Sequence, residues 1–370
     1  MKRILAFSLA VIMLLACMTG CSSKPSYKED TVMTVNGVEI SWDEYMFWIG
    51  YAAMYLNYQY SMYGMELDWS AEVQEGMTAA QWCVDYAQKT IVQKAVIDAK
   101  CAEMEITLNE DEQAEVQKSL DDYKAQCCGE DATDDQFEAY LKTNEYSNIS
   151  VLRSSQTTTA LTNKLFDKLY GEDNSKVDGN ELLALAEENG YTKANHILFL
   201  FTDENGEARS DAEKAAGKAK LEGFMEELNA IEDKEARYAR FLELKEENCE
   251  DTGTEAYQFA AGTMVEEFYN KSLELGEYEM DIVETTYGYH LMIGLPLDLD
   301  YSVTGGANQE PLSLRETMVN KMFTDQLEQW QNEAEVKMIG EFEDFDFTSV
   351  FGPSGFIYQS WADRAAAKKK

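Results

Sequence analysis

Residues 262–294 read GTMVEEFYNKSLELGEYEMDIVETTYGYHLMIG, and residues 194–201 read ANHILFLF. These two stretches hold both histidines of the 370-residue chain, His196 and His290. Each histidine lies in an apolar run that is too short for a helix, one followed by the turn-forming residues 202–206 and the other preceded by Gly288. The pattern predicts two buried β-strands, each carrying one imidazole.

Side chains on neighbouring strands can contact each other, because facing Cβ atoms lie about 4.5–5.5 Å apart. We therefore expect His196 and His290 to form one unit. Between them in sequence, Met264 and Phe268 are four residues apart, so one helical turn would point both side chains the same way. We expect these two residues to form the floor of an apolar pocket.

Three segments, ANHIL, GTMVEEF and TTYGYHLMI, occur in this order and resemble the three motifs of parvulin-type peptidyl-prolyl isomerases. FLELK at residues 241–245 and EDTG at 250–253 resemble the helix of that family and the acidic turn after it. The likeness covers about a third of the chain. It implies an antiparallel sheet flanked by helices, peptidyl-prolyl cis-trans isomerase activity and no cofactor.

The resemblance also implies residue roles. His196 and His290 would form a hydrogen-bonded pair behind the reacting amide. Asp251 would stand where the family carries Cys or Asp, and Thr285 would add a hydroxyl to the network. The prolyl ring would be held by three apolar side chains, Phe259, Met264 and Phe268.

Two departures from the family pattern bear on activity. Many relatives have GGDLG after the acidic turn, whereas this chain has the shorter segment GTEAYQF at 253–259, which puts an apolar wall and the position of Asp251 in question. Tyr287 stands where smaller or apolar residues are common, and Cys249 is an alternative to Asp251. A domain without turnover, in which the histidines are a buried structural pair, therefore stays an alternative.

The first 20 residues have the pattern of an export signal. A basic start precedes an apolar run from Ile4 to Ala16, which is too short to span a membrane. The sequence MTGC at 18–21 resembles a bacterial lipobox, so we predict a signal peptide at 1–20, lipidation of Cys21 and a tether at 21–30. Cleavage before Cys17 and an ordinary signal with an incidental cysteine are the alternatives.

Composition and charge limit the partners. Hydrophobic residues make up 45% of the chain, which is enough for folded cores, and the formal charge is −38. Without residues 1–20, 29 basic and 69 acidic side chains leave a formal charge of −40. Such a chain repels nucleic-acid phosphates and anionic lipid surfaces, so we expect no nucleic-acid partner and a membrane association through the lipid alone.

Five further cysteines are predicted to be free thiols. Cys83 and Cys101 lie on one predicted helix, about 27 Å apart, which is too far for a disulfide. Cys127 and Cys128 lack CxxC spacing and have no histidine nearby, so they indicate neither a zinc site nor a redox motif. We expect no metal site, because the conceivable ligands, His196, His290, Asp251 and Cys249, are scattered along the chain without short spacing.

The segment after the tether opens with VNGVEIS at 35–41, in which Asn36-Gly37 predicts a hairpin turn and Ser41 a helix start. This opening, upstream of a parvulin-like pattern, resembles the N-terminal chaperone domain of PrsA- and SurA-type extracytoplasmic foldases. The next helix, at 45–63, is rich in aromatic residues and methionine, which suits either core packing or an adaptable client surface. We expect a mostly helical domain at 31–177, with further helices at 78–104, 109–127, 134–143 and 147–170.

The remaining boundaries follow from turn-rich segments. GEDNSKVDG at 171–179 is the expected joint, and we place the isomerase-like domain at 178–300, with helices at 182–188, from 210 and at 235–247. A helix at 314–338 cannot bury its apolar face alone. In the foldase families the last helix returns to the N-terminal domain, so residues 301–345 would complete that domain and the isomerase would be an insertion. The tail at 346–370 has no assigned role.

Together these features predict an α+β foldase, lipid-anchored on the outer face of the cytoplasmic membrane, that isomerises X-Pro bonds in unfolded or newly exported proteins. One alternative is an inactive parvulin-like chaperone that only holds clients. Another is a lipoprotein that delivers a small solute to a transporter. Formation of a homodimer is left open.

Overall fold

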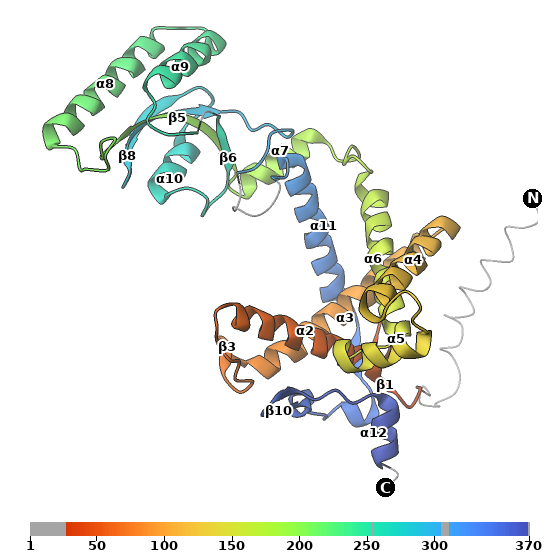
Figure 1. Cartoon of the computed structure of the whole chain (residues 1–370). Helices are drawn as coiled ribbons and strands as arrows, with labels where there is room; N and C mark the ends of the chain where they lie inside the picture. Colours follow the sequence, from red (N-terminus) through yellow and green to blue (C-terminus); the bar gives the residue numbers. More distant parts are fainter. Residues whose placement is uncertain (1–26, 254, 305–310, 369–370) are drawn as a thin grey trace, which may run out of the picture. The chain divides into compact units, whose positions relative to one another are not determined.

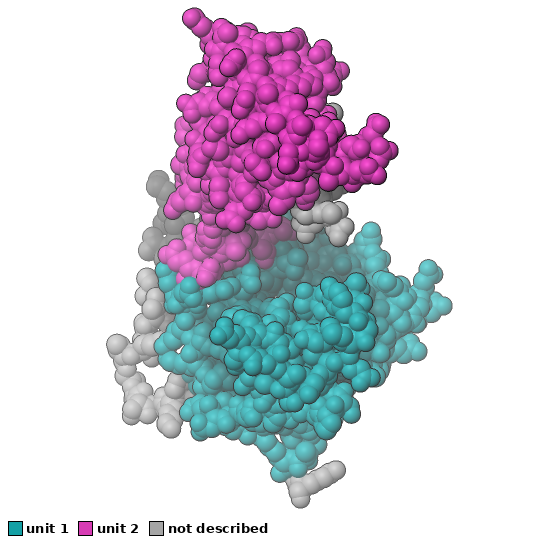
Figure 2. Space-filling model, turned by 90° about the vertical axis from the view of Figure 1, so that its left-hand side faces the viewer, with its two compact units in different colours: residues 1–161, 330–370 teal, residues 162–329 magenta. Residues whose placement is uncertain are grey.

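The computed structural model describes residues 27–253, 255–304 and 311–368. The predicted signal peptide, Cys21 and most of the tether lie outside the described residues. The chain divides into two compact units, one formed by residues 1–161 and 330–370 and the other by 162–329 (Figure 2). The second unit is an insertion into the first. The structure confirms the α+β fold, with a mostly helical N-terminal region, an inserted antiparallel sheet and a C-terminal helix.

The first unit contains a three-stranded antiparallel sheet in the order β2-β1-β9. β1 (Thr31–Val35) and β2 (Val38–Ser41) are joined at the predicted hairpin turn, where Asn36 and Gly37 have φ of 50° and 83°. Positive φ at both central residues is what a type I′ turn requires. β9 (Val336–Met338) pairs with β1 on the other side, with Met338 opposite Met33.

Helices form most of this unit (Figure 1). α2 begins after Ser41, whose hydroxyl accepts a hydrogen bond from the Glu44 N–H (3.2 Å), as the sequence predicted. Thr78, Asn109 and Thr133 cap the next three helices with reciprocal side-chain bonds. The helices are α2 (Trp42–Met62), α3 (Ala79–Glu103), α4 (Glu110–Cys128), α5 (Asp134–Tyr140) with a π-helical turn at Leu141–Glu145, and α6 (Ile149–Tyr170); a small hairpin, β3 (Glu72–Gln74) and β4 (Met77–Thr78), precedes α3.

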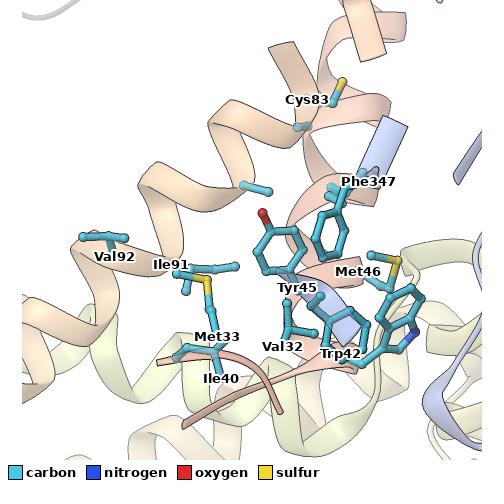
Figure 3. Packing of buried hydrophobic residues seen from close by; sticks show 14 of the residues in the cluster. Val32, Met33, Ile40, Trp42, Tyr45, Met46, Cys83, Ile91, Val92 and Phe347 are labelled. Carbon is cyan, nitrogen blue, oxygen red and sulfur yellow. The ribbon is translucent and has the colours of Figure 1, made fainter. Parts of the chain in front are cut away.

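The aromatic helix α2 has two different faces. Trp42, Tyr45 and Met46 are buried with β1 and α3 in one hydrophobic core (Figure 3). Tyr51 and Tyr55 on the other face are 42% and 48% exposed. Core packing therefore explains one half of this helix, and the other half is available at the surface.

The C-terminal segment differs from the expected single helix at 314–338. α11 (Leu314–Glu333) ends earlier, and residues 336–338 form the strand β9. The reason is that Asn36 binds both the N–H and the C=O of Glu335, at 2.8 Å each, so this backbone is held by the β1–β2 turn. The two apolar residues of β9 also alternate with Lys337, a period of two that fits a strand.

The segment after β9 packs into the first unit. Phe342 and Phe347 are buried, and their rings lie 5.5 Å and 6.2 Å from that of Trp42. Two 3₁₀ turns (Gly340–Phe342 and Phe347–Val350), a hairpin of β10 (Phe351–Gly352) and β11 (Gly355–Phe356), and α12 (Trp361–Lys368) complete it.

The second unit contains an antiparallel sheet in the order β6-β5-β8-β7. Its strands are β5 (Thr192–Leu200), β6 (Tyr257–Phe259), β7 (Met280–Glu284) and β8 (Gly288–Leu295). α8 (Asp211–Asn229) and α9 (Lys234–Asn248) cover one face, where Ile197 packs with Leu221 and Phe241. α10 (Glu266–Glu274) covers the other, where Ala194 packs with Phe268 (Figure 1). α7 (Gly179–Glu188) packs with α11 in a separate cluster.

Two further features concern the described part of the chain. All five cysteines in it, Cys83, Cys101, Cys127, Cys128 and Cys249, are free thiols. None of its helices is long and apolar enough to cross a membrane.

Candidate active site

The two histidines lie on the two central strands of the second sheet. His290 of β8 is opposite Leu198 of β5, and His196 is opposite Met292, so the imidazoles are diagonal rather than directly facing neighbours. Both are buried, at 5% and 4% exposure. Their Nδ1 atoms are 2.8 Å apart, and their rings are stacked with centroids 5.0 Å apart. The predicted pair is therefore present in the structure, with a diagonal register.

Two predicted polar residues extend the pair at either end. Asp251, just after α9, has Oδ2 at 2.9 Å from Nε2 of His196. Thr285, between β7 and β8, has Oγ1 at 2.9 Å from Nε2 of His290. Cys249, the alternative to Asp251, instead packs on the opposite face of the sheet, in the hydrophobic cluster that α8 and α9 cover. There its sulfur accepts a hydrogen bond from the Leu198 N–H (3.3 Å).

The shortened segment after Asp251 does not displace this carboxylate. It brings in Tyr257 of β6, whose hydroxyl donates to Oδ2 of Asp251 at 2.9 Å. Gly253 makes room for that hydroxyl, since a Cβ there would lie 1.9 Å from the oxygen. The sequence does not identify Tyr257 as a site residue, because no motif contains it and the family pattern differs in this shortened segment.

An apolar cluster adjoins the imidazoles. The Phe268 ring stands edge-on to both, with centroids 5.2 Å from His196 and 5.4 Å from His290. Phe259 lies 5.8 Å from Phe268, and Met264 packs against the same cluster. Phe259 and Phe268 are 0% and 3% exposed, so the half-buried Met264 is the member of the three that reaches the surface.

One expectation about this cluster was wrong. Met264 and Phe268 do not share a helical turn, because α10 begins at Glu266 and Val265 is its N-cap with extended backbone (φ −60°, ψ 146°). Met264 therefore lies in the loop before the helix. The two side chains still converge, because the loop folds back over the cluster around Phe259.

Comparison with known proteins bears on this unit. Residues 181–293 match the family model of the PPIC-type PPIase domain. This part of the chain is a parvulin-type PPIase domain. Similar solved structures include PrsA from Bacillus subtilis (20% identity, 69% of this chain and 86% of that chain, TM-score 0.22). Another is peptidylprolyl isomerase (PrsA) from Bacillus anthracis (20% identity, 66% and 94%, TM-score 0.25). No curated protein matches the chain.

Burial determines the charge state of the imidazoles in the PPIase domain. Burial lowers the pKa of His290 to about 3, and the neighbouring His196 contributes to the lowering. Burial also lowers the pKa of His196, although its hydrogen bond to Asp251 acts in the opposite direction. Both rings are therefore neutral at pH 7.

The carboxylate of Asp251, at one end of this series of hydrogen bonds, is ionised. The hydrogen bond from His196 holds the pKa of Asp251 well below its usual range, and the hydroxyl of Tyr257 adds to this effect. Burial raises the pKa of Tyr257 to about 12, and the hydrogen bond to Asp251 acts in the same direction. This hydroxyl therefore keeps its proton. The site thus holds one negative charge at its polar end.

One arrangement of protons satisfies these contacts. An ionised Asp251 only accepts, so Nε2 of His196 carries the hydrogen and its Nδ1 is an acceptor. His290 must then donate from Nδ1, which leaves its Nε2 to accept from the hydroxyl of Thr285. These three hydrogen bonds therefore run in one direction, from Thr285 through both imidazoles to Asp251.

Metal chemistry has no evident site here. Among residues 27–253, 255–304 and 311–368, no three His, Cys, Asp or Glu side chains are grouped so that they could hold a metal ion.

Proposed function

We propose that the PPIase domain catalyses cis-trans isomerisation of X-Pro peptide bonds. Rotation about such a bond breaks amide resonance, so it has a barrier of about 18–20 kcal/mol and takes tens to hundreds of seconds without a catalyst. A site accelerates it by stabilising the twisted amide more than the planar one. This requires a fixed apolar seat for the ring and oriented dipoles, and no covalent step.

The observation that carries the proposal is the neutral histidine pair in contact with the Phe268 cluster. Phe259, Met264 and Phe268 would hold the prolyl ring. His196, His290, Thr285 and Asp251 would present a preorganised hydrogen-bond chain to the reacting amide, at a place where burial strengthens electrostatic effects. Because the chain ends on a carboxylate, the imidazoles keep one orientation while the amide rotates.

Substitutions in the apolar cluster that would hold the prolyl ring test this assignment. We expect Met264→Ala and Phe268→Leu each to lower kcat/KM for a chromogenic Ala-Pro peptide about tenfold or more, because a lost contact in an apolar pocket changes rates by roughly 10–200-fold. Leu273→Ala, on the same helix α10 and 49% exposed, is the matched control and should keep the full rate. Full activity in both Met264→Ala and Phe268→Leu would contradict the assignment of this cluster to the prolyl ring.

A second function, holding unfolded clients, is favoured by an aromatic row on the first unit. The rings of Tyr51 and Tyr86, Tyr86 and Trp82, and Trp82 and Tyr55 stack in succession, at 6.3 Å, 5.3 Å and 6.3 Å. Such rings offer adaptable apolar contacts to extended chains. In a client-aggregation assay, the double variant Tyr55→Ala/Trp82→Ala should lose protection while peptide isomerisation is unchanged. Undiminished protection would contradict a role for this row.

We further propose that the chain is anchored outside the cytoplasmic membrane by a lipid on Cys21 and acts there on newly exported proteins. The support is the lipobox-like sequence MTGC at 18–21. Labelled palmitate should be incorporated into the wild-type chain and not into Cys21→Ala, which should be released from the membrane fraction. Incorporation into the variant would refute the assignment of Cys21.

Domain limits are also a proposal. We place the functional isomerase domain at 178–300, which encloses the family match at 181–293. The compact unit 162–329 extends beyond these limits at both ends, since it begins inside α6 and ends inside α11. Limited proteolysis should yield a stable fragment that begins in the turn-rich segment 171–179. A fragment that ends or begins inside the sheet would contradict these limits.

A further inference from the structure

Lys245 is a buried ammonium group that the site as described above does not use. It lies on α9, under the face of β5 that is opposite to the imidazoles, and its exposure is 5%. Nζ donates to Oδ1 of Asn195 (2.7 Å) and to the carbonyl oxygen of Glu255 (3.2 Å). Both acceptors are uncharged, and no carboxylate of the described residues forms an ion pair with it.

Asn195 links this ammonium to the active site. Its amide is fully buried, and Nδ2 donates to the hydroxyl of Tyr238 at 3.1 Å. Oδ1 accepts at the same time from Lys245 and from the backbone N–H of His196 (2.8 Å). Consecutive strand residues point to opposite faces, so this one amide connects the buried cation to the backbone that carries the imidazole.

The charges around His196 come from several elements. His290 faces it from β8, Tyr257 stands beside it on β6, and Asp251 binds its Nε2 from the loop after α9. Asp251 raises the pKa of His196, whereas Lys245 lowers it. Burial lowers the pKa of Lys245 itself, and Cys249 and Asp251 oppose that effect. The buried cation thus balances the carboxylate across the strand.

We propose that Lys245 is a positioning residue of the PPIase site, which fixes the His196 segment through Asn195 and places a positive charge behind the His196 imidazole, opposite the negative charge of Asp251. A buried cation with uncharged partners is costly to retain, which favours an electrostatic role over a purely structural one. Its contribution to catalysis rests on the isomerase function proposed above; its effect on the imidazoles does not.

Titration of the histidine rings by NMR tests the electrostatic part directly, because the chain has only two histidines. In Lys245→Met, we expect the titration midpoint of the His196 signals to rise by roughly 0.5–1 pH unit, since a cation that disfavours its imidazolium form is gone. Lys234→Met, the same change at an exposed position of α9, should leave the midpoint unchanged. Unchanged midpoints in a folded Lys245→Met protein would overturn the proposal.

A second variant guards against misfolding of the first. Asn195→Asp keeps the shape of the side chain and puts a compensating carboxylate beside Lys245, so it should move the histidine midpoint in the same upward direction. A downward shift or none would contradict the proposed charge balance.

The catalytic part is tested by the pH profile of kcat/KM in the full-length protein. Lys245→Met should move the acidic limb of the profile upward by the same amount as the NMR midpoint, in addition to the loss of kcat/KM that a less well positioned His196 causes at every pH. A loss that is uniform at every pH, with the acidic limb unmoved, would show a merely structural role. If wild type has no isomerase activity, the proposed function fails while the NMR result still decides the role of Lys245.

Discussion

At the scale of single residues, the candidate site works through hydrogen bonds that remain satisfied after burial. His196 has Asp251 and His290 as partners, and His290 has Thr285. These residues were expected from the resemblance to parvulins, whose motifs the segments 194–198, 250–253 and 285–293 resemble. Tyr257 and Asn195 were not, since each acquires its partner only when β6 and α9 pack beside β5.

Acid should destabilise the PPIase domain through His290. Its pKa in the folded protein is about 3, against about 6.5 in an unfolded chain. Between these pH values the unfolded chain binds more protons than the folded domain. The contribution of His290 to the free energy of unfolding is therefore fully present above pH 6.5 and falls as the pH decreases, by up to about 1.4 kcal/mol per pH unit. Asp251, whose pKa is lowered, adds a loss only below about pH 4.

Hydrogen exchange of the β5 and β8 amides between pH 7 and pH 4.5 measures this effect. The His290→Phe variant lacks the titrating group, so its opening free energy should fall less steeply over the same range. An equal slope in wild type and variant would contradict a buried neutral His290.

At the scale of elements, the pairing of β5 with β8 depends on close backbone approach. Gly288 begins β8, and a Cβ there would lie 2.0 Å from the carbonyl oxygen of Phe199. The sequence showed only that Gly288 precedes a short apolar run. It did not show that the neighbouring strand leaves no room for a side chain.

Gly288→Ala should therefore destabilise the PPIase domain by at least about 2 kcal/mol, because backbone atoms cannot yield as a flexible side chain can. Gly223→Ala in α8, where nothing lies within 4 Å of the added Cβ, is the matched control and should stabilise the helix by roughly 0.5–1 kcal/mol. Amide exchange in β5 and β8 measures both. A Gly288→Ala protein as stable as wild type would rule out the tight packing of this strand pair.

Elements with local signals were well predicted, and those without them were not. Ser41, Asn109 and Ser210 stand at predicted helix starts, and each accepts a hydrogen bond from the backbone N–H three residues later. The strands β6 and β9 have three residues each, which is too short for a period of two to identify a strand. They form because the neighbouring strands, β5 and β1, offer hydrogen-bonding groups, which a local sequence pattern does not reveal.

At the scale of the whole molecule, segments far apart in sequence build the first unit. β9 completes the sheet begun by β1, and Phe347 from the C-terminal segment packs on Tyr45 at 4.4 Å between ring centroids. The segment 346–370 has little periodicity of its own, so no local pattern predicted its place in the fold. Its aromatic side chains are nevertheless part of the core of the first unit.

Phe347→Ala should consequently destabilise the first unit by about 3–5 kcal/mol, the usual cost of removing a buried ring. Ile357→Ala, at a position 59% exposed, should change stability by less than about 0.5 kcal/mol. All six tryptophans, Trp42, Trp48, Trp69, Trp82, Trp330 and Trp361, belong to this unit, so tryptophan fluorescence in urea reports on it alone. Equal midpoints for the two variants would show that the C-terminal segment is dispensable.

The sequence by itself determined the α+β class and the identity of the two histidines, because short motifs and helix caps encode local geometry, and its resemblance to foldases implied the insertion of the PPIase domain. Only the tertiary structure decided the diagonal contact of the imidazoles, the hydroxyl of Tyr257 on Asp251 and the buried ammonium behind His196. These contacts depend on strand register and on which side chains share a face, and both are set by packing between segments that the chain brings together only on folding.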